Sequence, residues 1–138
     1  MVGHDARSDR GSMAIEIVIL TPVFLAFVLL IVAFGRAVDA QGKVDGAARD
    51  AARAASIARS SGAAVQAAND AAASDLADTT LFGCRTDVLD ALAPGTQIRV
   101  RVACSVTFDD LGLIGLSGSK DFEATVSAPV DTYTWRDS

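Results

Sequence analysis

The sequence predicts an α+β fold that is built on one long N-terminal helix. Three patterns predict it. An apolar run covers residues 13–35, alanines then recur at helical spacing as far as residue 78, and two later stretches, 96–108 and 121–130, alternate apolar and polar residues. We therefore expect a long helix, half in the membrane and half in water, a second and shorter alanine-rich helix, and a C-terminal antiparallel β-hairpin that packs on the long helix.

The composition limits what the soluble part of the chain can be. Residues 37–138 are enough for one compact domain and too few for two. Aromatic residues make up only 6% of the chain, so the domain has a small core and needs a long helix, a covalent bond or a partner to stay folded. The net charge of −5 argues against nucleic acid as a partner, because such binding depends on Lys and Arg neutralising phosphates.

The first 36 residues read as a leader followed by a membrane span. Residues 1–11 show no apolar periodicity, which predicts an unstructured leader. The apolar run that follows is long enough to cross a hydrocarbon core of about 30 Å, so we expect residues 12–36 to form one membrane-spanning helix. Arg7 and Arg10 lie on its short N-terminal side, which favours the N-terminus inside the cytoplasm and residues 37–138 outside it.

One charge, Glu16, lies within this apolar run, and two interpretations of it stay open. In the first, Ser12 caps the helix and Glu16 interacts with the positive end of the helix dipole. In the second, Glu16 has a specific positive partner, because a charge within the membrane costs about 2.5 to 3.5 kcal/mol. A new N-terminal ammonium, made by cutting the chain after Gly11, is such a partner. Pro22 lies deeper in the run and removes one helical hydrogen bond.

Alanine-rich sequence follows the span and predicts two helical segments. The first helix should continue over residues 37–58, with one face made of Val44, Ala47, Ala48, Ala51, Ala54, Ala55 and Ala58. Gly42 and Gly46 lie four residues apart, so a second helix can approach closely here, although alanine also favours helices by itself. After a Ser-Ser-Gly break, residues 63–78 should form the second helix, with Val65, Ala68, Ala72 and Leu76 on one face.

The last third of the chain predicts two strands. Residues 79–95 read as irregular and end in the Pro94-Gly95 turn signal. The strand at 96–108 should place six residues on its inner face: Ile98, Val100, Val102, Cys104, Val106 and Phe108. The strand at 121–130 should do the same with Phe122, Ala124, Val126, Ala128 and Val130. A lone hairpin is marginal in water, so its apolar face should lie on the long helix.

Two cysteines, Cys84 and Cys104, follow the span and lie in the part that we place outside the cytoplasm. An even pair in an oxidising compartment predicts a disulfide, which would tie the irregular segment to the strand. A closed loop of about 20 residues is worth roughly 3 kcal/mol in the chain-entropy model. Two buried free thiols are the alternative.

The sequence predicts no catalytic, cofactor-binding or metal site. His4 is the only histidine and lies in the leader, across the membrane from both cysteines. A Ser/His/Asp or Cys/His arrangement is therefore excluded, and two cysteines without a histidine cannot complete a tetrahedral zinc site. We expect a protein that is not an enzyme.

Residues 10–23, followed by an apolar helix that closes with Gly35 and Arg36, resemble the N-terminus of the TadE/TadG-like pseudopilins. These are minor pilin-like proteins of the tight-adherence (Flp-type) branch of type IV pili. The resemblance implies that a prepilin peptidase cuts between Gly11 and Ser12, which makes Glu16 the fifth residue of the mature chain. Pro22 matches the family's proline, while Ile17 stands where the family usually has an aromatic residue.

The same resemblance implies a function, partners and a location. It implies a minor pseudopilin that acts in assembling a Tad/Flp-type pilus for adhesion and surface attachment. Its partners would be the prepilin peptidase, membrane lipid and, through the apolar helix, other pilins or pseudopilins and the assembly platform. It would lie in the inner membrane as a single-pass protein, or in the pilus on the cell surface. Gly11 and Ser12 would then be the processing residues, and Glu16 and Pro22 the assembly residues.

Two alternatives to a cleaved pseudopilin stay open at this stage. The first is an uncleaved single-pass anchor that displays a small extracytoplasmic binding module. The second is a secretory signal peptide, with Val38, Asp39 and Ala40 as small residues before a cut at Gln41. The apolar run is longer than the 7 to 15 residues or so of an ordinary signal peptide, which argues against this second alternative.

Overall fold

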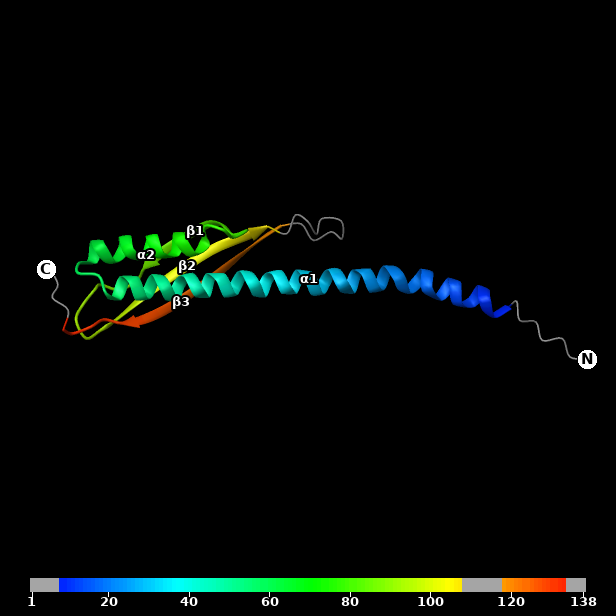
Figure 1. Ribbon diagram of the computed structural model, residues 1–138, viewed down its shortest axis with the longest axis horizontal. Coiled ribbons are helices and arrows are strands. Elements are labelled where there is room, and N and C mark those ends of the chain that lie inside the picture. Colours follow the sequence, from blue (N-terminus) through cyan, green and yellow to red (C-terminus); the bar gives the residue numbers. More distant parts are fainter. Residues whose placement is uncertain (1–7, 108–117, 134–138) are drawn as a thin grey trace, which may run out of the picture. The chain divides into compact units, whose positions relative to one another are not determined.

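The computed structural model describes residues 8–107 and 118–133, with side chains from residue 14 onward. The chain divides into two compact units, Met1–Arg36 and Ala37–Ser138. Five elements follow one another along the chain: α1 (Ser8–Ser56), α2 (Ser61–Leu76), β1 (Phe82–Val88), β2 (Gln97–Thr107) and β3 (Ser119–Pro129) (Figure 1). This confirms the predicted α+β fold with a long N-terminal helix and a second, shorter helix.

Helix α1 begins at Ser8, four residues before the expected start. The prediction that Ser12 caps the helix is therefore wrong for the uncut chain, because Ser12 lies within the helix. Residues 8–11 of the expected leader are helical as well. Residues 1–7 of that leader lie outside the described part of the chain.

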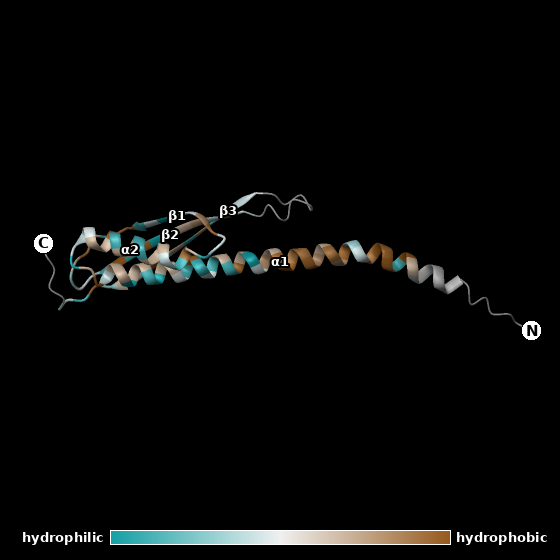
Figure 2. Cartoon of the chain, turned by 45° about the horizontal axis from the view of Figure 1, so that its top comes forward, coloured by the Kyte–Doolittle hydropathy of each residue, from teal (hydrophilic) through white to brown (hydrophobic). Residues whose placement is uncertain are grey.

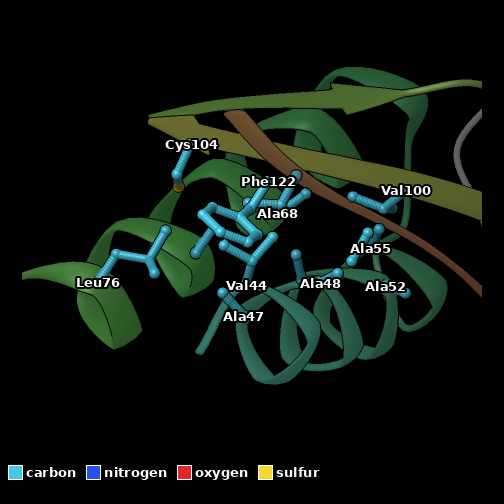
Figure 3. Packing of buried hydrophobic residues seen from close by; sticks show 14 of the residues in the cluster. Val44, Ala47, Ala48, Ala52, Ala55, Ala68, Leu76, Val100, Cys104 and Phe122 are labelled. Carbon is cyan, nitrogen blue, oxygen red and sulfur yellow. The ribbon is translucent and has the colours of Figure 1, made fainter. Parts of the chain in front are cut away.

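The second half of α1 buries a face made almost entirely of alanine, as the helical spacing predicts. Its buried residues are Ala40, Val44, Ala47, Ala48, Ala51, Ala52 and Ala55, whereas Ala54 and Ala58 are half-buried. Side chains this small let the helix lie close to its neighbours (Figure 3). A Cβ added to Gly42 or Gly46 would meet no atom within 4 Å, so within the described chain these two glycines make no close contact.

Helix α2 starts two residues earlier than expected because Ser60 caps it. The Ser60 hydroxyl accepts a hydrogen bond of 3.2 Å from the backbone N–H of Ala63. The buried face consists of Ala64, Ala68, Ala72 and Leu76. The prediction that Val65 faces inward is wrong: Val65 is 43% exposed, because a spacing of four residues from Ala68 leads back to Ala64.

The two predicted strands, β2 and β3, form the expected antiparallel pair. Their register is unbroken from Gln97 opposite Pro129 to Thr107 opposite Ser119. The expected inner faces are confirmed: Ile98, Val100, Val102, Cys104, Val106, Phe122, Ala124 and Val130 are buried, and Val126 and Ala128 are half-buried against them. Phe108 lies outside the described residues. Together with the alanine faces of α1 and α2, these side chains form the hydrophobic core (Figure 3).

The prediction that residues 79–95 are irregular is wrong for residues 82–88, which form a third strand, β1. The sheet order is β1-β2-β3, and β1 pairs antiparallel with β2 from Phe82 opposite Ser105 to Val88 opposite Val100. The register shifts between Phe82 and Arg85, and Gly83 adopts a positive φ of 61° there. Such a bulge interrupts the alternation that a regular strand shows in its sequence.

Arg99 and Asp90 fix the segment after β1 to the middle strand. The Arg99 Nε and Nη2 atoms donate to the two Asp90 carboxylate oxygens at 2.8 and 2.9 Å. The Arg99 backbone N–H also donates to Asp90 at 3.0 Å. These hydrogen bonds hold the pKa of the Asp90 carboxyl below its ordinary value. Because Asp90 lies two residues after the end of β1, this bidentate contact holds the C-terminal end of β1 beside β2.

Candidate functional site

The predicted site residues lie in two different parts of the structure. Gly11, Ser12, Glu16 and Pro22 all lie on α1 within the first unit, and Cys84 and Cys104 lie in the sheet of the second unit. Residues Ser12 and Glu16 are four positions apart and share one face of the helix. Pro22 follows Glu16 by six residues, about 600° around the helix, so it lies on a different face.

The part of α1 that carries Glu16 is mostly hydrophobic (Figure 2), and its large apolar side chains are exposed. Their exposure ranges from 36% to 70% for Ile15, Ile17, Val18, Ile19, Leu20, Val23, Phe24, Leu25, Phe27, Val28, Leu29, Leu30, Ile31, Val32 and Phe34. Within the described part of the chain, one helix, Ala14–Ser56, includes a stretch long and apolar enough to cross a membrane. Such a surface needs lipid or other helices around it.

The Glu16 carboxylate is exposed within this apolar surface and has no partner among the described residues. The helix dipole does not account for it in the uncut chain. Its effect fades beyond the first turn, and Glu16 lies eight residues after the start of α1 at Ser8. Any positive partner of Glu16 therefore lies outside the described residues.

Helix α1 continues through Pro22 with one local adjustment. Proline has no N–H to donate to the Val18 carbonyl, so one hydrogen bond of the helix is missing at this point. The neighbouring Thr21 hydroxyl donates to the Ile17 carbonyl at 2.6 Å. This contact satisfies the hydroxyl of Thr21 within an apolar segment, where an unpaired polar group is costly.

Cys84 and Cys104 form the predicted disulfide, and the alternative of two free thiols is wrong. The bond joins the bulged start of β1 to the middle strand β2. Cys104 is buried in the core, as the strand register predicts, whereas Cys84 is exposed. The disulfide thus holds the end of β1 at which the regular ladder is interrupted.

Two carboxylates, Asp50 on α1 and Asp75 on α2, lie close together between the helices. Partial burial raises the pKa of Asp75, and the hydrogen bond and negative charge of Asp50 raise it further. Because the folded-state pKa is raised, the folded chain loses stability as the pH rises from the ordinary value of 3.8 through that raised pKa.

Replacing Asp75 by asparagine removes this penalty, so Asp75→Asn should raise the thermal midpoint slightly at pH 7. The effect is at most a few tenths of a kcal/mol, since both side chains are solvated. Below pH 3.8 the difference from wild type should disappear. Thermal melts of both proteins at pH 3.5 and pH 7 test this, and a variant that is less stable at pH 7 would contradict it.

Sequence reasoning missed the functional candidates on β1, above all Arg85 at the edge of the sheet. A signal was present: Phe82, Cys84, Thr86 and Val88 alternate with Gly83, Arg85 and Asp87. The glycine and the short length of the segment obscured it. Sequence reasoning also missed that Gln41 of α1 donates to the backbone carbonyl of Glu123 on β3 at 3.3 Å, a contact that no local pattern indicates.

Comparisons with known proteins find one similarity. The family model described as TadE-like protein matches residues 11–53. No curated protein and no solved structure matches the chain. The matched segment starts at Gly11, includes Glu16 and Pro22, and ends near the C-terminal end of α1. The resemblance seen in residues 10–23 is therefore confirmed: residues 11–53 of helix α1 match the TadE-like family.

Proposed function

We propose that the chain is a minor pseudopilin of a Tad (Flp-type) pilus, with a structural and not an enzymatic role in assembling the pilus for adhesion. In this proposal a prepilin peptidase cuts after Gly11, and the mature chain assembles through α1 with other pilins or pseudopilins and the assembly platform. The match of residues 11–53 to TadE-like proteins supports the pilus system. The observation that carries the assembly role is Glu16, exposed and unpartnered among the described residues in an apolar helix.

Cleavage after Gly11 supplies the missing partner of Glu16. The cut leaves a positively charged amine at Ser12, at the start of the same apolar surface. When α1 leaves the membrane, neighbouring helices must take the place of the lipid around it. The amine of one chain can then neutralise Glu16 of another. An ion pair in such surroundings is far less screened than one in water. Glu16 is thus an assembly residue, and Pro22 belongs to the same helix segment.

The proposed topology places the N-terminus in the cytoplasm, α1 across the inner membrane and residues 37–138 outside. The disulfide Cys84–Cys104 supports this topology, because disulfides persist in oxidising compartments and are rare in the cytoplasm. From this position the chain either stays in the membrane or enters the pilus on the cell surface. Membrane lipid and the prepilin peptidase are its first partners.

An uncleaved single-pass anchor that displays a binding module is the second candidate. One observation favours it: α1 is already helical from Ser8, so the bond between Gly11 and Ser12 lies within a helix. A peptidase needs an extended chain in its active site, so cleavage requires this first part of α1 to unfold locally. In such an uncleaved anchor no new amine forms, so Glu16 gains no positive partner from cleavage.

The variant Glu16→Ala tests the assembly role. We expect it to be inserted and folded as wild type, because Glu16 makes no hydrogen bond or ion pair with a described residue. We also expect it to be incorporated into pili at least about tenfold less, as the loss of a buried ion pair implies. The measurement is the amount of the protein in sheared pili relative to the membrane fraction. Asp39→Ala is the matched control, since Asp39 lies on the same helix and pairs with Lys43 one turn away. Normal incorporation of Glu16→Ala would contradict the role.

A further inference from the structure

The sheet has two edge strands, β1 and β3, on either side of β2, and no further strand of the described residues pairs with either (Figure 1). Backbone hydrogen bonds show which groups face outward. The Leu89 N–H donates to the Arg99 carbonyl at 2.9 Å, so the odd-numbered residues of β2 bond toward β1. The Val130 N–H donates to the Thr96 carbonyl at 2.8 Å, so even-numbered residues bond between β2 and β3. The odd-numbered residues of β3 therefore direct their N–H and carbonyl groups away from the sheet.

The outer edge of β3 is long and regular. Four of its residues direct both the backbone N–H and the backbone carbonyl away from β2: Asp121, Glu123, Thr125 and Ser127. The Gln41 side chain reaches the Glu123 carbonyl at a long 3.3 Å, and no other group in the described ranges pairs with this edge. Proteins usually protect such an edge with bulges, prolines or a covering element. Here Pro129 protects only its last residue.

The outer edge of β1 offers complementary groups. By the same alternation, Thr86 and Val88 direct their backbone groups outward. Beside this edge lies a hollow between β1 and α2, whose α2 side is lined by Asn69, Ala72, Ala73 and Leu76. A strand added to this edge would place its inward side chains beside Ala72, Ala73 and Leu76 of α2.

The residues at the two edges match row by row across the sheet. Arg85 lies opposite Ala103, which lies opposite Glu123. Likewise Val88 lies opposite Val100, which lies opposite Val126. In the same way, Thr86 and Ala124 lie at the two ends of one row of residues across the sheet, and Asp87 and Thr125 lie at the two ends of another. Because β1 and β3 are each antiparallel to β2, they run in the same direction, and a copy displaced sideways brings β3 beside β1 with these pairs adjacent.

We propose that the chain binds a second copy of itself in this way, with the β3 edge of one copy paired in parallel with the β1 edge of the next. Glu123 then meets Arg85 of the second copy on the solvent face, and half-buried Val126 meets its Val88 on the inner face. The Thr125 N–H donates to the Thr86 carbonyl of the second copy, and its Thr86 N–H donates to the Glu123 carbonyl in place of Gln41. No like charges face each other in this register.

A contact between two different edges does not close on itself within a dimer. It produces rings or open filaments, because each copy still has one free β1 edge or one free β3 edge. The inference rests on the proposed function, in which copies meet in an assembly, and it names the surface through which they meet. The proposed contact involves only the sheet and α2, and both lie in the unit Ala37–Ser138.

Site-specific photo-cross-linking of the full chain in its native membrane tests the pairing. With p-benzoylphenylalanine in place of Thr125, we expect a cross-linked dimer whose linked peptide comes from residues 82–88 of the second copy. The same probe in place of exposed Gln66 on α2 is the control and should give no such product. Absence of the product at position 125, or its mapping to a segment other than β1, would overturn the inference.

Charge reversal sharpens this test. Glu123→Arg and Arg85→Glu should each lower the cross-linking yield about fivefold, and their combination should restore it, because the pair is exposed and contributes about 1 kcal/mol. Asp70→Arg makes the same charge change at an exposed residue of α2 that belongs to neither edge strand, and it should leave the yield unchanged. Equal yields in all variants would count against the proposed pair.

The intact mass of the same samples separates the two proposals. A chain that begins at Ser12 but gives no product between position 125 and β1 would refute the edge pairing and leave the proposed function standing. A chain that retains Met1 and still gives the product would refute the pseudopilin and leave the edge pairing standing.

Discussion

Replacing Cys84 and Cys104 by alanine is expected to lower the thermal midpoint of the domain by about 12 to 24 °C. The disulfide closes a loop of 20 residues, which is worth roughly 3 kcal/mol. In a domain of this size each kcal/mol shifts the midpoint by about 4 to 8 °C. The effect is large because the core consists mainly of alanine and has few large side chains to compensate.

The loss should appear first in β1 and α2. The bulge weakens the start of β1, where the disulfide replaces the missing regular pairing, and three of the four side chains that α2 buries are alanines. Circular dichroism melts of the full chain in detergent measure the midpoint, and hydrogen exchange locates the unfolding. Reduction of wild-type protein should reproduce the variant. A midpoint that stays unchanged in both cases would contradict a structural role for the bond.

The substitution Ile98→Ala should destabilise the domain by about 2 to 5 kcal/mol. Ile98 is fully buried near the start of the alternating strand β2, so its truncation leaves a cavity among side chains too small to fill it. The helical residue Val65 serves as the control, because it is 43% exposed. Val65→Ala should change the stability by less than about 0.5 kcal/mol. Urea unfolding measures both, and similar losses for the two variants would contradict the described core.

The elements that the sequence predicts correctly are those whose periodicity is strong and local. Strand β2 alternates apolar and polar residues without a break, and the structure buries the apolar set in the core. The buried face of α2 was harder to assign. Alanine at nearly every position gives little contrast, so the spacing alone places Val65 on the inner face, where the structure has Ala64.

Strand β1 escaped prediction because tertiary contacts determine it. It is short, contains a glycine and a bulge, and is stabilised by a disulfide to residue 104 and by pairing with β2. None of these contacts is visible in a window of seven residues. The edge residues Arg85 and Glu123 became candidates only once the register placed them in one row of the sheet.

The sequence predicts the position of the candidate processing site more directly than it predicts the local structure around that site. Gly11, Glu16 and Pro22 carry the resemblance, and the TadE-like match covers all three. The predicted helix start at Ser12 is wrong because two other residues that favour helix starts, Ser8 and Asp9, precede it. The longer helix removes the dipole explanation of Glu16 in the uncut chain, so the proposed cleavage is the source we propose for a positive partner.

The central claim, that the chain is cut between Gly11 and Ser12, predicts the effect of changing the glycine. Gly11→Ala should leave the chain uncut, because the resemblance places this glycine at the peptidase cleavage position. Gly35→Ala is the matched control on the same helix, where an added Cβ meets no atom within 4 Å, and it should be cut normally.

The most direct measurement is the intact mass, with N-terminal sequencing, of the protein isolated from its native membrane. The claim predicts a mature chain that begins at Ser12, with Glu16 as its fifth residue. A chain that retains Met1 would contradict it and favour the uncleaved anchor, and a chain that begins at Gln41 would instead identify a secreted domain.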